Sequence, residues 1–210
     1  MAMKEQSGFD AKAQEWDDDV RRVRLAEQVV SAVQQQVPLT RDMVGLDFGC
    51  GTGLVTMGLA PFVKRMVGID SSRGMIKVLS EKVLRRGVQN VTANYVNLDD
   101  GDRLSGSYDL VMTSMTLHHV VNVPSLLAEF ARVLKVGGWL CLADLDLDGG
   151  RFHDDNAGVI HFGIDRKKLQ GMMEQAGFRD VTFATAASIL KKRPAGEEIF
   201  KVFLATGRRM

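Results

Sequence analysis

The middle of the chain alternates between short apolar runs and longer stretches in which apolar residues recur at helical spacing. Five apolar runs have the length of a strand, and they span residues 43–49, 65–70, 91–96, 108–115 and 139–145. Helices are predicted between these runs over about residues 53–64, 72–86 and 123–134. Apolar strands that alternate with helices are typical of a parallel sheet covered on both faces. The pattern therefore predicts a three-layer α/β/α fold.

The two ends of this region carry their own signals. An apolar stripe predicts a helix over about residues 17–36, which ends before Pro38. The glycine pair in KVGGW, residues 135–139, predicts a turn before the fifth strand. No internal repeat or low-complexity segment interrupts the pattern.

The last third of the chain has a different pattern. The loop over residues 146–163 is long for a compact domain, which favours a functional lid or a substrate loop. A helix is predicted over about residues 165–176. Two runs with stronger alternation follow at 178–190 and 197–209, joined by the turn-like sequence KKRPAG. We predict that these two runs form an antiparallel pair that closes one edge of the sheet.

Composition narrows the class of protein. The chain has 210 residues, 45% of them hydrophobic and 25% charged, with a formal net charge of +1. This balance lacks the basic footprint of a dedicated nucleic-acid-binding protein. No apolar run approaches the roughly 20 residues that span a bilayer, and the N-terminus lacks the apolar core of a signal peptide. Two cysteines provide neither a disulfide framework nor a repeated CxxC zinc pattern. We expect a cytoplasmic protein without a membrane partner.

The stretch LDFGCGTG, which joins the first predicted strand to the first helix of the core, contains Gly49, Gly51 and Gly53. Glycine adopts positive φ angles and lets a ligand approach the backbone. The start of a helix adds free N–H groups and the positive end of its dipole. A strand, a glycine turn and a helix in this order favour a cofactor site over a plain turn.

An acidic residue follows at the position that this hypothesis needs. Asp70 ends the second predicted strand, and a carboxylate at that point can accept hydrogen bonds from both hydroxyls of an adenosine ribose. An alternative role is to cap the next helix, together with Ser71 or Ser72. The two roles are compatible.

The details of the loop discriminate between adenosine ligands. Dinucleotide-binding folds use G-x-G-x-x-G and place a pyrophosphate at the helix N-terminus. Here Leu54 stands where the last of those glycines belongs, and Asp47 lies beside the loop. A carboxylate at that point repels a pyrophosphate but attracts an ammonium group. S-adenosylmethionine carries an ammonium group and a sulfonium centre.

Together these motifs resemble the class I S-adenosylmethionine-dependent methyltransferases, in particular their small-molecule, type 11 members. LDFGCGTG resembles their first motif, Asp70 their ribose acid, and YDLVMTSMTLHHV and LKVGGWLCLADL their fourth and fifth strand regions. The resemblance covers about residues 42–146. It implies a seven-stranded Rossmann-like sheet with strand order 3-2-1-4-5-7-6 and an antiparallel strand seven. It also implies transfer of a methyl group from S-adenosyl-L-methionine to a small-molecule acceptor, with S-adenosyl-L-homocysteine as product.

The resemblance also assigns cofactor residues. Asp47 and the loop glycines are expected at the methionine portion, Asp70 at the ribose, and Leu98 with Asp99 at the adenine. The backbone around Ser114 is expected to accept a hydrogen bond from the ammonium group. The full expected set is Asp47, Gly49, Cys50, Gly51, Gly53, Asp70, Ser71, Leu98, Asp99 and Ser114.

The same resemblance divides the chain, which we expect to form one methyltransferase domain over residues 1–210. Residues 1–38 would form a helical lid, 42–146 the cofactor-binding core, and 147–210 the substrate loop, a helix and the terminal strands. Trp16 in the lid either covers the cofactor or anchors the lid to the core by packing.

Candidates for acid–base chemistry follow the fourth and fifth strands. His118 and His119 are predicted at the carboxyl edge of the sheet, where open α/β folds bind ligands. A base is needed only if the acceptor must lose a proton. Adjacent residues generally point in different directions, so at most one of the two is expected to reach the acceptor. His119 is preferred from the resemblance, and Asp144 is a further candidate at the same edge. Capping the next helix or packing under the loop are the alternatives for both histidines.

Other features separate the remaining possibilities for the acceptor. The prolines of the nucleic-acid amino-methyltransferase motif are absent after the fourth strand, and neither Cys50 nor Cys141 stands at a catalytic cysteine position of the RNA cytosine-5 enzymes. His153 and His161 lie among aspartates in the long loop but match no metal-ligand spacing, so a solvated loop without a metal is favoured. We expect the acceptor between the N-terminal helices and the loop over 146–163.

Two alternative functions stay open at this point. An NAD(P)-linked oxidoreductase shares the fold class but is disfavoured by Leu54 and Asp47. A non-catalytic methyltransferase-like binding protein would not need the intact cofactor residues. The basic sequences KKLQ and LKKRPAG offer modest surface for RNA or protein, although they are more typical of a solvated helix face and a hairpin turn. The acceptor atom and the oligomeric state are left open.

Overall fold

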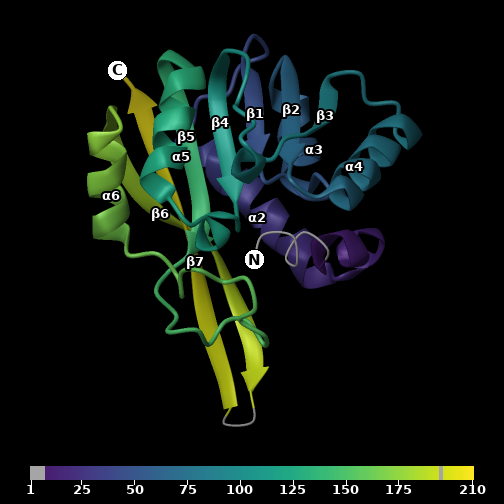
Figure 1. The fold of residues 1–210 in the computed structure, drawn as a ribbon, viewed down its shortest axis with the longest axis vertical. Helices are drawn as coiled ribbons and strands as arrows, with labels where there is room; N and C mark the ends of the chain where they lie inside the picture. The colour runs from purple at the N-terminus through teal and green to yellow at the C-terminus, as the bar shows by residue number, and fades with distance from the viewer. Residues whose placement is uncertain (1–7, 194–195) are drawn as a thin grey trace.

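Seven strands form one sheet with the order β3-β2-β1-β4-β5-β7-β6 (Figure 1). The computed structural model describes residues 8–193 and 196–210. The strands are β1 (Val44–Phe48), β2 (Arg65–Asp70), β3 (Val91–Tyr95), β4 (Tyr108–Ser114), β5 (Leu134–Leu145), β6 (Phe178–Arg193) and β7 (Gly196–Arg209). β1 to β5 pair in parallel, whereas β7 is antiparallel to both β5 and β6. The predicted strand order and the antiparallel last strand are confirmed.

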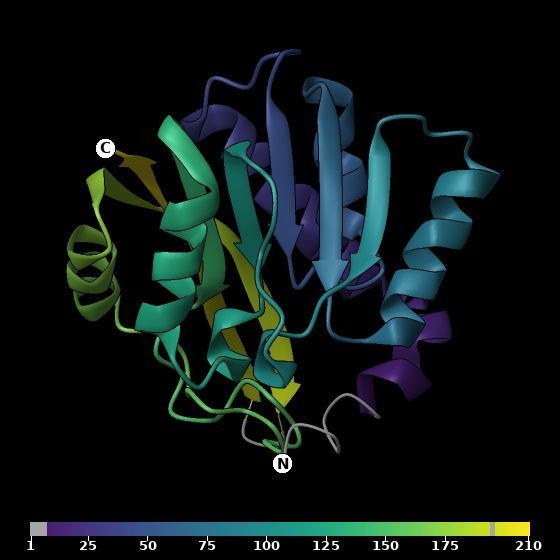
Figure 2. The ribbon, with the colours of Figure 1, turned by 45° about the horizontal axis from the view of Figure 1, so that its top comes forward.

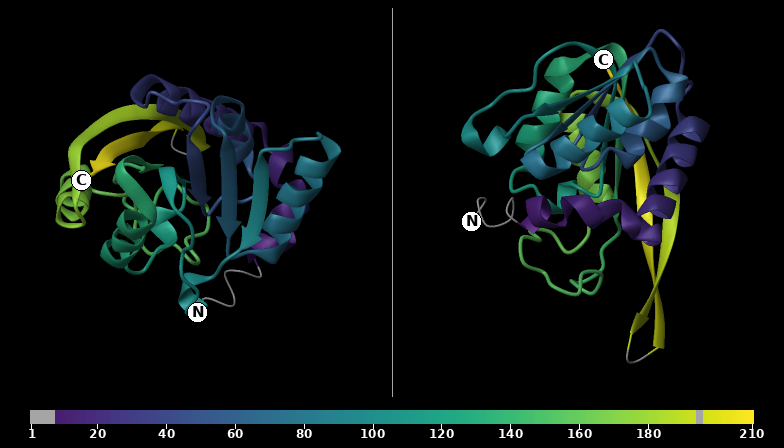
Figure 3. Two further views of the ribbon diagram at one scale, coloured as in Figure 1. Left: turned by 90° about the horizontal axis from the view of Figure 1, so that it is seen from above. Right: turned by 90° about the vertical axis from the view of Figure 1, so that its right-hand side faces the viewer.

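Helices cover both faces of the sheet (Figure 3). The α-helices are α2 (Val20–Gln36), α3 (Leu54–Leu59), α4 (Arg73–Arg85), α5 (Val123–Val133) and α6 (Arg166–Gln175). The 3-10 helices are η1 (Ala13–Asp18), η2 (Ala60–Phe62), η3 (Leu98–Asp100) and η4 (Leu117–His119). Apolar residues of α2, α3 and α4 pack in one core, and those of α5 and α6 pack in the other. This arrangement confirms the three-layer prediction.

The strands show why their apolar runs are nearly continuous. Along β4, Leu110 and Met112 point into the first core, and Val111 between them points into the second. All three side chains are fully buried. A central strand between two helical layers therefore has no solvent-facing position to fill with polar residues.

Three elements differ from the sequence prediction. The first core helix is shorter, because α3 gives way at Ala60 to the 3-10 turn η2, where Pro61 lacks the N–H that an α-helix needs. The N-terminal helix is broken at Asp19, whose side chain accepts a hydrogen bond from Arg21 N and caps α2. β5 begins earlier than predicted and includes the KVGGW segment. The register nevertheless skips there, from Tyr108 opposite Leu134 to Leu110 opposite Trp139, so the segment bulges out of the ladder.

The last two strands form a hairpin that is longer than the sheet is tall. β6 and β7 pair from Phe178 opposite Arg209 to Arg193 opposite Gly196, whereas β7 pairs with β5 only as far as Val202. The rest of the hairpin projects beyond the sheet as an arm, and the loop over 146–163 lies beside it (Figure 1). The tip of the predicted turn, Pro194 and Ala195, lies outside the described residues.

The parallel strands point their carboxyl ends to one edge of the molecule (Figure 2). The N-terminal segment and the loop over 146–163 both lie at this edge. Within the described ranges, no helix combines the length and the apolar character that crossing a membrane requires.

Candidate active site

A pocket of about 1200 Å³ lies at the carboxyl edge of the sheet. Its wall combines the loops after β1, β2, β3 and β4 with the N-terminal segment, the loop over 146–163 and the arm. Nine of the ten residues that the resemblance assigned to the cofactor line this pocket: Asp47, Gly49, Cys50, Gly51, Asp70, Ser71, Leu98, Asp99 and Ser114. The tenth, Gly53, does not.

The three glycines of the loop have two different roles. All have positive φ, at 67° for Gly49, 55° for Gly51 and 80° for Gly53. A Cβ on Gly51 would have Met75 Sδ at 4.0 Å as its one neighbour within that distance, so this glycine faces the open pocket. A Cβ on Gly53 would lie 2.3 Å from Leu79 Cδ1. Gly51 therefore leaves its backbone open to the pocket, and Gly53 allows α3 to start against α4.

Asp70 holds the glycine loop rather than capping α4. Its Oδ2 accepts a hydrogen bond from Gly51 N at 2.8 Å, and its Oδ1 accepts one from Ser72 N at 2.8 Å. The cap is Ser72, whose Oγ accepts from Met75 N at 3.1 Å. Burial raises the pKa of Asp70 from its usual value, although the backbone N–H groups of Ser72 and Gly51 oppose this change. Each carboxylate oxygen has a second lone pair, and the group lines the pocket where ribose hydroxyls would lie.

Asp47 is a buried acid beneath the same loop. Its side chain is 1% exposed, and its Oδ2 accepts a hydrogen bond from Thr56 Oγ1 at 2.6 Å. Burial raises the pKa of Asp47 to about 7, and the nearby negative charge of Asp70 adds to this effect. A cationic group in the pocket would favour the ionised form of Asp47. A buried acid at this point of the pocket therefore suits a ligand that carries an ammonium group.

The far end of the pocket begins at η3, a 3-10 turn that the sequence did not predict. Asn97 precedes it, and its side chain accepts a hydrogen bond from Asp99 N at 3.2 Å. Leu98 and Asp99 line the pocket here and offer an apolar side chain and a carboxylate. Cys50 is buried, and burial raises the pKa of its thiol well above the usual value, so it presents an uncharged wall.

The N-terminal segment is fastened across the pocket by two aspartates. Asp10 Oδ1 accepts hydrogen bonds from Ser72 Oγ at 2.5 Å and from Gly74 N at 2.7 Å. Asp17 accepts from Thr52 Oγ1 at 2.5 Å and from Lys82 Nζ at 2.5 Å. We call Asp10 and Asp17, with the groups that bind them, the lid latch.

Lys82 is the buried centre of this latch. Its side chain is 4% exposed, and its Nζ also donates to Thr52 O at 2.7 Å, within the glycine loop. Sequence analysis did not single out Lys82, Asp10 or Asp17. Lysine and aspartate are common on helix surfaces, so their pairing became apparent only from the tertiary structure.

Trp16 lies on η1 in the N-terminal segment. Its ring lines the pocket, packs edge-on against Phe9 with ring centroids 5.9 Å apart, and carries the guanidinium carbon of Arg22 at 3.8 Å from its centroid. Its ring therefore packs within the N-terminal segment and forms part of the pocket wall.

His118 and His119 both line the pocket. They lie on the tight 3-10 turn η4, and their ring centroids are 4.1 Å apart. His118 is 1% exposed, and its Nδ1 lies 2.7 Å from Oδ1 of the fully buried Asp144. His119 Nδ1 lies 3.0 Å from Gly158 O in the long loop. Burial lowers the pKa of His119 below its usual value.

The long loop, most of which is at least partly exposed to solvent, contributes a third histidine to the pocket wall. His153 lines the pocket with its ring centroid 5.0 Å from that of His118. Burial and the two neighbouring imidazoles lower the pKa of His153 to about 4. His161 instead supports the loop, with Nε2 2.9 Å from Val120 O. Across the described residues, no group of three or more His, Cys, Asp or Glu side chains is arranged to hold a metal ion.

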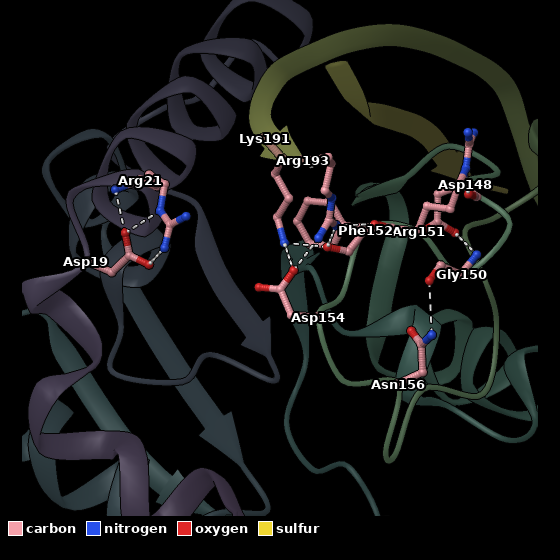
Figure 4. A network of polar contacts seen from close by, with 10 residues as sticks. All are labelled: Asp19, Arg21, Asp148, Gly150, Arg151, Phe152, Asp154, Asn156, Lys191 and Arg193. Atoms are coloured by element: carbon pink, nitrogen blue, oxygen red, sulfur yellow. Dashed lines mark hydrogen bonds and ion pairs between the residues drawn. The ribbon is translucent and has the colours of Figure 1, made fainter. Parts of the chain in front are cut away.

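A polar network fastens the long loop to the arm (Figure 4). Asp154 Oδ1 lies 2.5 Å from Arg193 Nη1 and 3.6 Å from Lys191 Nζ, and Lys191 also donates to the carbonyl oxygen of Phe152. Arg151 Nη1 lies 2.9 Å from Glu198 Oε1 on β7. The loop that carries His153 is therefore positioned by the end of the chain.

Comparisons with known proteins find methyltransferases. A family model described as "Methyltransferase domain" matches residues 46–142. An uncharacterised methyltransferase of Schizosaccharomyces pombe is 36% identical over 132 residues, which are 56% of this chain and 46% of that protein. A ubiquinone biosynthesis O-methyltransferase of Dechloromonas aromatica is 31% identical over 115 residues, 54% of this chain and 49% of that protein. The chain thus spans less than half the length of either relative.

Solved structures share the fold at low sequence identity. The YcgJ protein of Bacillus subtilis has a TM-score of 0.73 at 16% identity, covering 86% of this chain and 97% of that one. Phosphoethanolamine N-methyltransferase 2 of Haemonchus contortus, solved with S-adenosyl-L-methionine, has a TM-score of 0.70 at 15% identity, covering 87% and 52%. The matched family region contains the glycine loop, Asp70 and the central strands of a sheet with the order that the motifs implied. Residues 46–142 thus form a methyltransferase domain, with the glycine loop, the acidic residue after β2 and the strand order of the class I S-adenosylmethionine-dependent methyltransferases.

Proposed function

We propose that this protein transfers a methyl group from S-adenosyl-L-methionine to a small-molecule acceptor and releases S-adenosyl-L-homocysteine. The observation that carries the proposal is the continuity of the pocket. One wall runs from Asp99 past Asp70 and Asp47 to the histidines and the long loop without leaving the cavity. A donor and an acceptor could therefore lie end to end, as in-line displacement at a methyl group requires.

We call the part of the pocket lined by the loops after β1, β2, β3 and β4 the donor half. Each of its residues has a role in this proposal. Asp70 would accept hydrogen bonds from the ribose hydroxyls, and Gly51 would let the ligand lie against the backbone. Asp47 and the backbone at Ser114 would bind the ammonium end, and Leu98 and Asp99 the adenine. The bound donor supplies an activated methyl group on a positively charged sulfur. The protein then contributes alignment and exclusion of water, because the lid and the long loop close over the junction.

Calorimetry with S-adenosyl-L-homocysteine and with NAD tests the donor. We expect S-adenosyl-L-homocysteine to bind and NAD not to bind. A pyrophosphate site needs a glycine where Leu54 stands, and the Asp47 carboxylate would repel a pyrophosphate. Binding of NAD alone would favour the oxidoreductase alternative. Transfer of label from radiolabelled S-adenosyl-L-methionine to a metabolite extract then separates an enzyme from a binding protein.

The raised pKa of Asp47 predicts a pH dependence of donor binding. In the free protein Asp47 has a pKa of about 7, whereas an ammonium group beside it favours ionisation. Affinity for S-adenosyl-L-homocysteine should therefore rise about tenfold per pH unit below pH 7 and level off above it, while the ligand's amino group stays protonated up to about pH 8. Calorimetry at pH 5.5 in two buffers of different ionisation enthalpy should show about one proton released per ligand bound.

The Asp47→Asn variant is the control for this dependence, because it cannot ionise. It should bind with little change in affinity between pH 5.5 and pH 7. The free protein gives a second readout with the opposite sign. The folded state holds the Asp47 proton up to about pH 7, whereas an unfolded aspartate releases it near pH 3.9, so Asp47 should lower the free energy of unfolding as pH rises between these values. A wild-type affinity that is flat over the same range would contradict the assignment of Asp47.

A further inference from the structure

We propose that His118, oriented by Asp144, is the general base of this site, and that the methyl acceptor is the hydroxyl group of a phenol or an enol. The inference rests on the proposed methyl transfer and specifies its acceptor. His118 would be a catalytic residue in contact with the acceptor, and Asp144 a positioning residue that acts through it.

The first argument is the geometry of the pair. Asp144 Oδ1 lies 2.7 Å from His118 Nδ1 and also accepts from Leu145 N at 2.7 Å. Its Oδ2 accepts from His118 N at 3.4 Å. A carboxylate that accepts these backbone N–H groups fixes the tautomer of the ring, with the proton on Nδ1 and the lone pair on Nε2. Since His118 lines the pocket, this is the arrangement of a base held by a third group.

The second argument concerns the surroundings of His118. The titratable groups that face it are Asp144 on β5, His119 on the same turn, and His153 on the long loop. Burial lowers the pKa of both His119 and His153, so neither carries a positive charge near neutral pH. Of the three imidazoles, His118 is the one whose ring bonds directly to a carboxylate that would stabilise its protonated form.

The third argument is the charge of the part of the pocket lined by the histidines, the N-terminal segment and the long loop, which we call the acceptor chamber. Two of its carboxylates pair with a guanidinium, Asp19 with Arg21 and Asp154 with Arg193, and the exposed Asp155 accepts a hydrogen bond from Ala157 N. An alkylammonium acceptor would thus find no buried carboxylate without a bonded partner in the described part of this wall, beside a donor that is itself cationic. Phe9, Trp16 and Phe152 line the chamber, and such rings favour a flat, uncharged acceptor.

The acidity of the acceptor follows from the strength of the base. A histidine removes a proton efficiently from a group whose pKa is not far above its own. A phenol, with a pKa near 10 as in tyrosine, meets this condition, whereas water and alkanols, with pKa values near 16, do not. An aromatic amine attacks through a neutral lone pair and needs no proton removed beforehand. The His118–Asp144 pair is therefore most useful to a phenolic or enolic hydroxyl.

The step balances without a further reagent. The hydroxyl proton moves to His118 Nε2 as the oxygen–methyl bond forms and the methyl–sulfur bond breaks. The electron pair of the broken bond stays on sulfur, which becomes the neutral thioether of S-adenosyl-L-homocysteine. The His118 imidazolium, stabilised by Asp144, then returns its proton to water.

Matched probes test the acceptor class. The full chain is incubated with methyl-labelled S-adenosyl-L-methionine and pairs of planar probes that differ only in carrying hydroxyl or amino groups: 7-hydroxy- and 7-amino-4-methylcoumarin, 1-naphthol and 1-naphthylamine, and catechol and 1,2-diaminobenzene. We expect labelled methyl ethers and no labelled amines. Label on amines, or no label on any phenol although S-adenosyl-L-homocysteine binds, would overturn this inference alone. Failure to bind S-adenosyl-L-homocysteine would instead overturn the proposed function.

A substitution then tests the base. His118→Gln should lower kcat on the labelled phenol by about 100-fold or more and leave S-adenosyl-L-homocysteine affinity within about twofold. His161→Gln is the matched control, because His161 lies outside the pocket wall and bonds to Val120 O. The defect of His118→Gln should shrink for the more acidic 6,8-difluoro-7-hydroxy-4-methylcoumarin once that phenol ionises by itself. An equal loss on both coumarins would indicate a structural role and overturn the inference.

Two measurements keep the test decisive if His118→Gln unfolds. In the wild type, with S-adenosyl-L-methionine saturating at every pH, kcat/KM on the hydroxycoumarin should fall as pH is lowered because one group becomes protonated. A profile that stays flat on the acid side would overturn the inference. In Asp144→Asn, loss of the carboxylate should move this acid limb to lower pH as well as lowering kcat. An unshifted limb would remove Asp144 from its positioning role.

Discussion

Replacing Asp70 with alanine is expected to weaken S-adenosyl-L-homocysteine binding about 100-fold, or about 2.8 kcal/mol. The substitution removes the carboxylate that would accept the ribose hydroxyls, and hydrogen bonds to charged groups contribute about 1.5–3 kcal/mol each. It also removes the acceptor that holds Gly51 N at 2.8 Å and so keeps the glycine loop in shape. Titration calorimetry at pH 7.5 measures the change.

Asp100→Ala is the matched control, because Asp100 is an exposed aspartate outside the pocket wall. It should bind with wild-type affinity. The Asp70→Ala variant should stay folded, since burial raises the pKa of Asp70 and the ionised group therefore costs the free protein stability at neutral pH. A folded Asp70→Ala protein that loses less than fivefold in affinity would exclude a role for Asp70 at the ribose.

Replacing Lys82 with methionine is expected to lower the free energy of unfolding by about 1–3 kcal/mol, because Thr52 O and the 31% exposed Asp17 carboxylate lose their buried donor. Lys82 is 4% exposed and is the donor that joins Asp17 of the lid to Thr52 of the glycine loop. Methionine fills most of the same volume but leaves both oxygens without this donor. Urea denaturation measures the loss, and amide exchange over residues 8–18 should accelerate because the lid latch is broken.

Lys77→Met is the control, on the same helix but with a side chain that is 69% exposed and a Glu81 partner at 3.9 Å. Exposed pairs of this kind contribute little, so the loss should be below about 0.5 kcal/mol. If Lys82→Met were as stable as Lys77→Met and its lid exchanged no faster, the latch would not hold the lid.

The donor half of the site could be predicted because its residues are close together along the chain. The glycine loop follows β1 directly, and Asp70 ends the next strand, so parallel pairing alone brings them to one edge. The motif could not distinguish Gly51 from Gly53, because the difference depends on Leu79, which reaches the loop from α4. Local sequence predicts that a glycine turn exists, but its neighbours decide what each glycine does.

The acceptor half depends on contacts between distant segments, and so it was predicted less well. The position of His153 depends on Lys191 and Arg193, which tie its loop to an arm formed by the end of the chain. His118 could be placed at the sheet edge from the sequence, but its bond to Asp144 comes from a neighbouring strand and a tight turn. Such pairings have no periodic signal.

Because the arm and the lid are formed by the two ends of the chain, the two halves of the pocket come from different parts of the sequence. The donor wall is built from one continuous middle segment, which the family match over residues 46–142 covers, whereas most of the acceptor wall comes from the two ends that this match leaves out. Substitutions in the terminal segments can therefore reshape the acceptor chamber without changing the residues that would bind the methyl donor. Related enzymes can thus change their acceptor through substitutions at the two ends of the chain and keep the donor-binding segment between them unchanged.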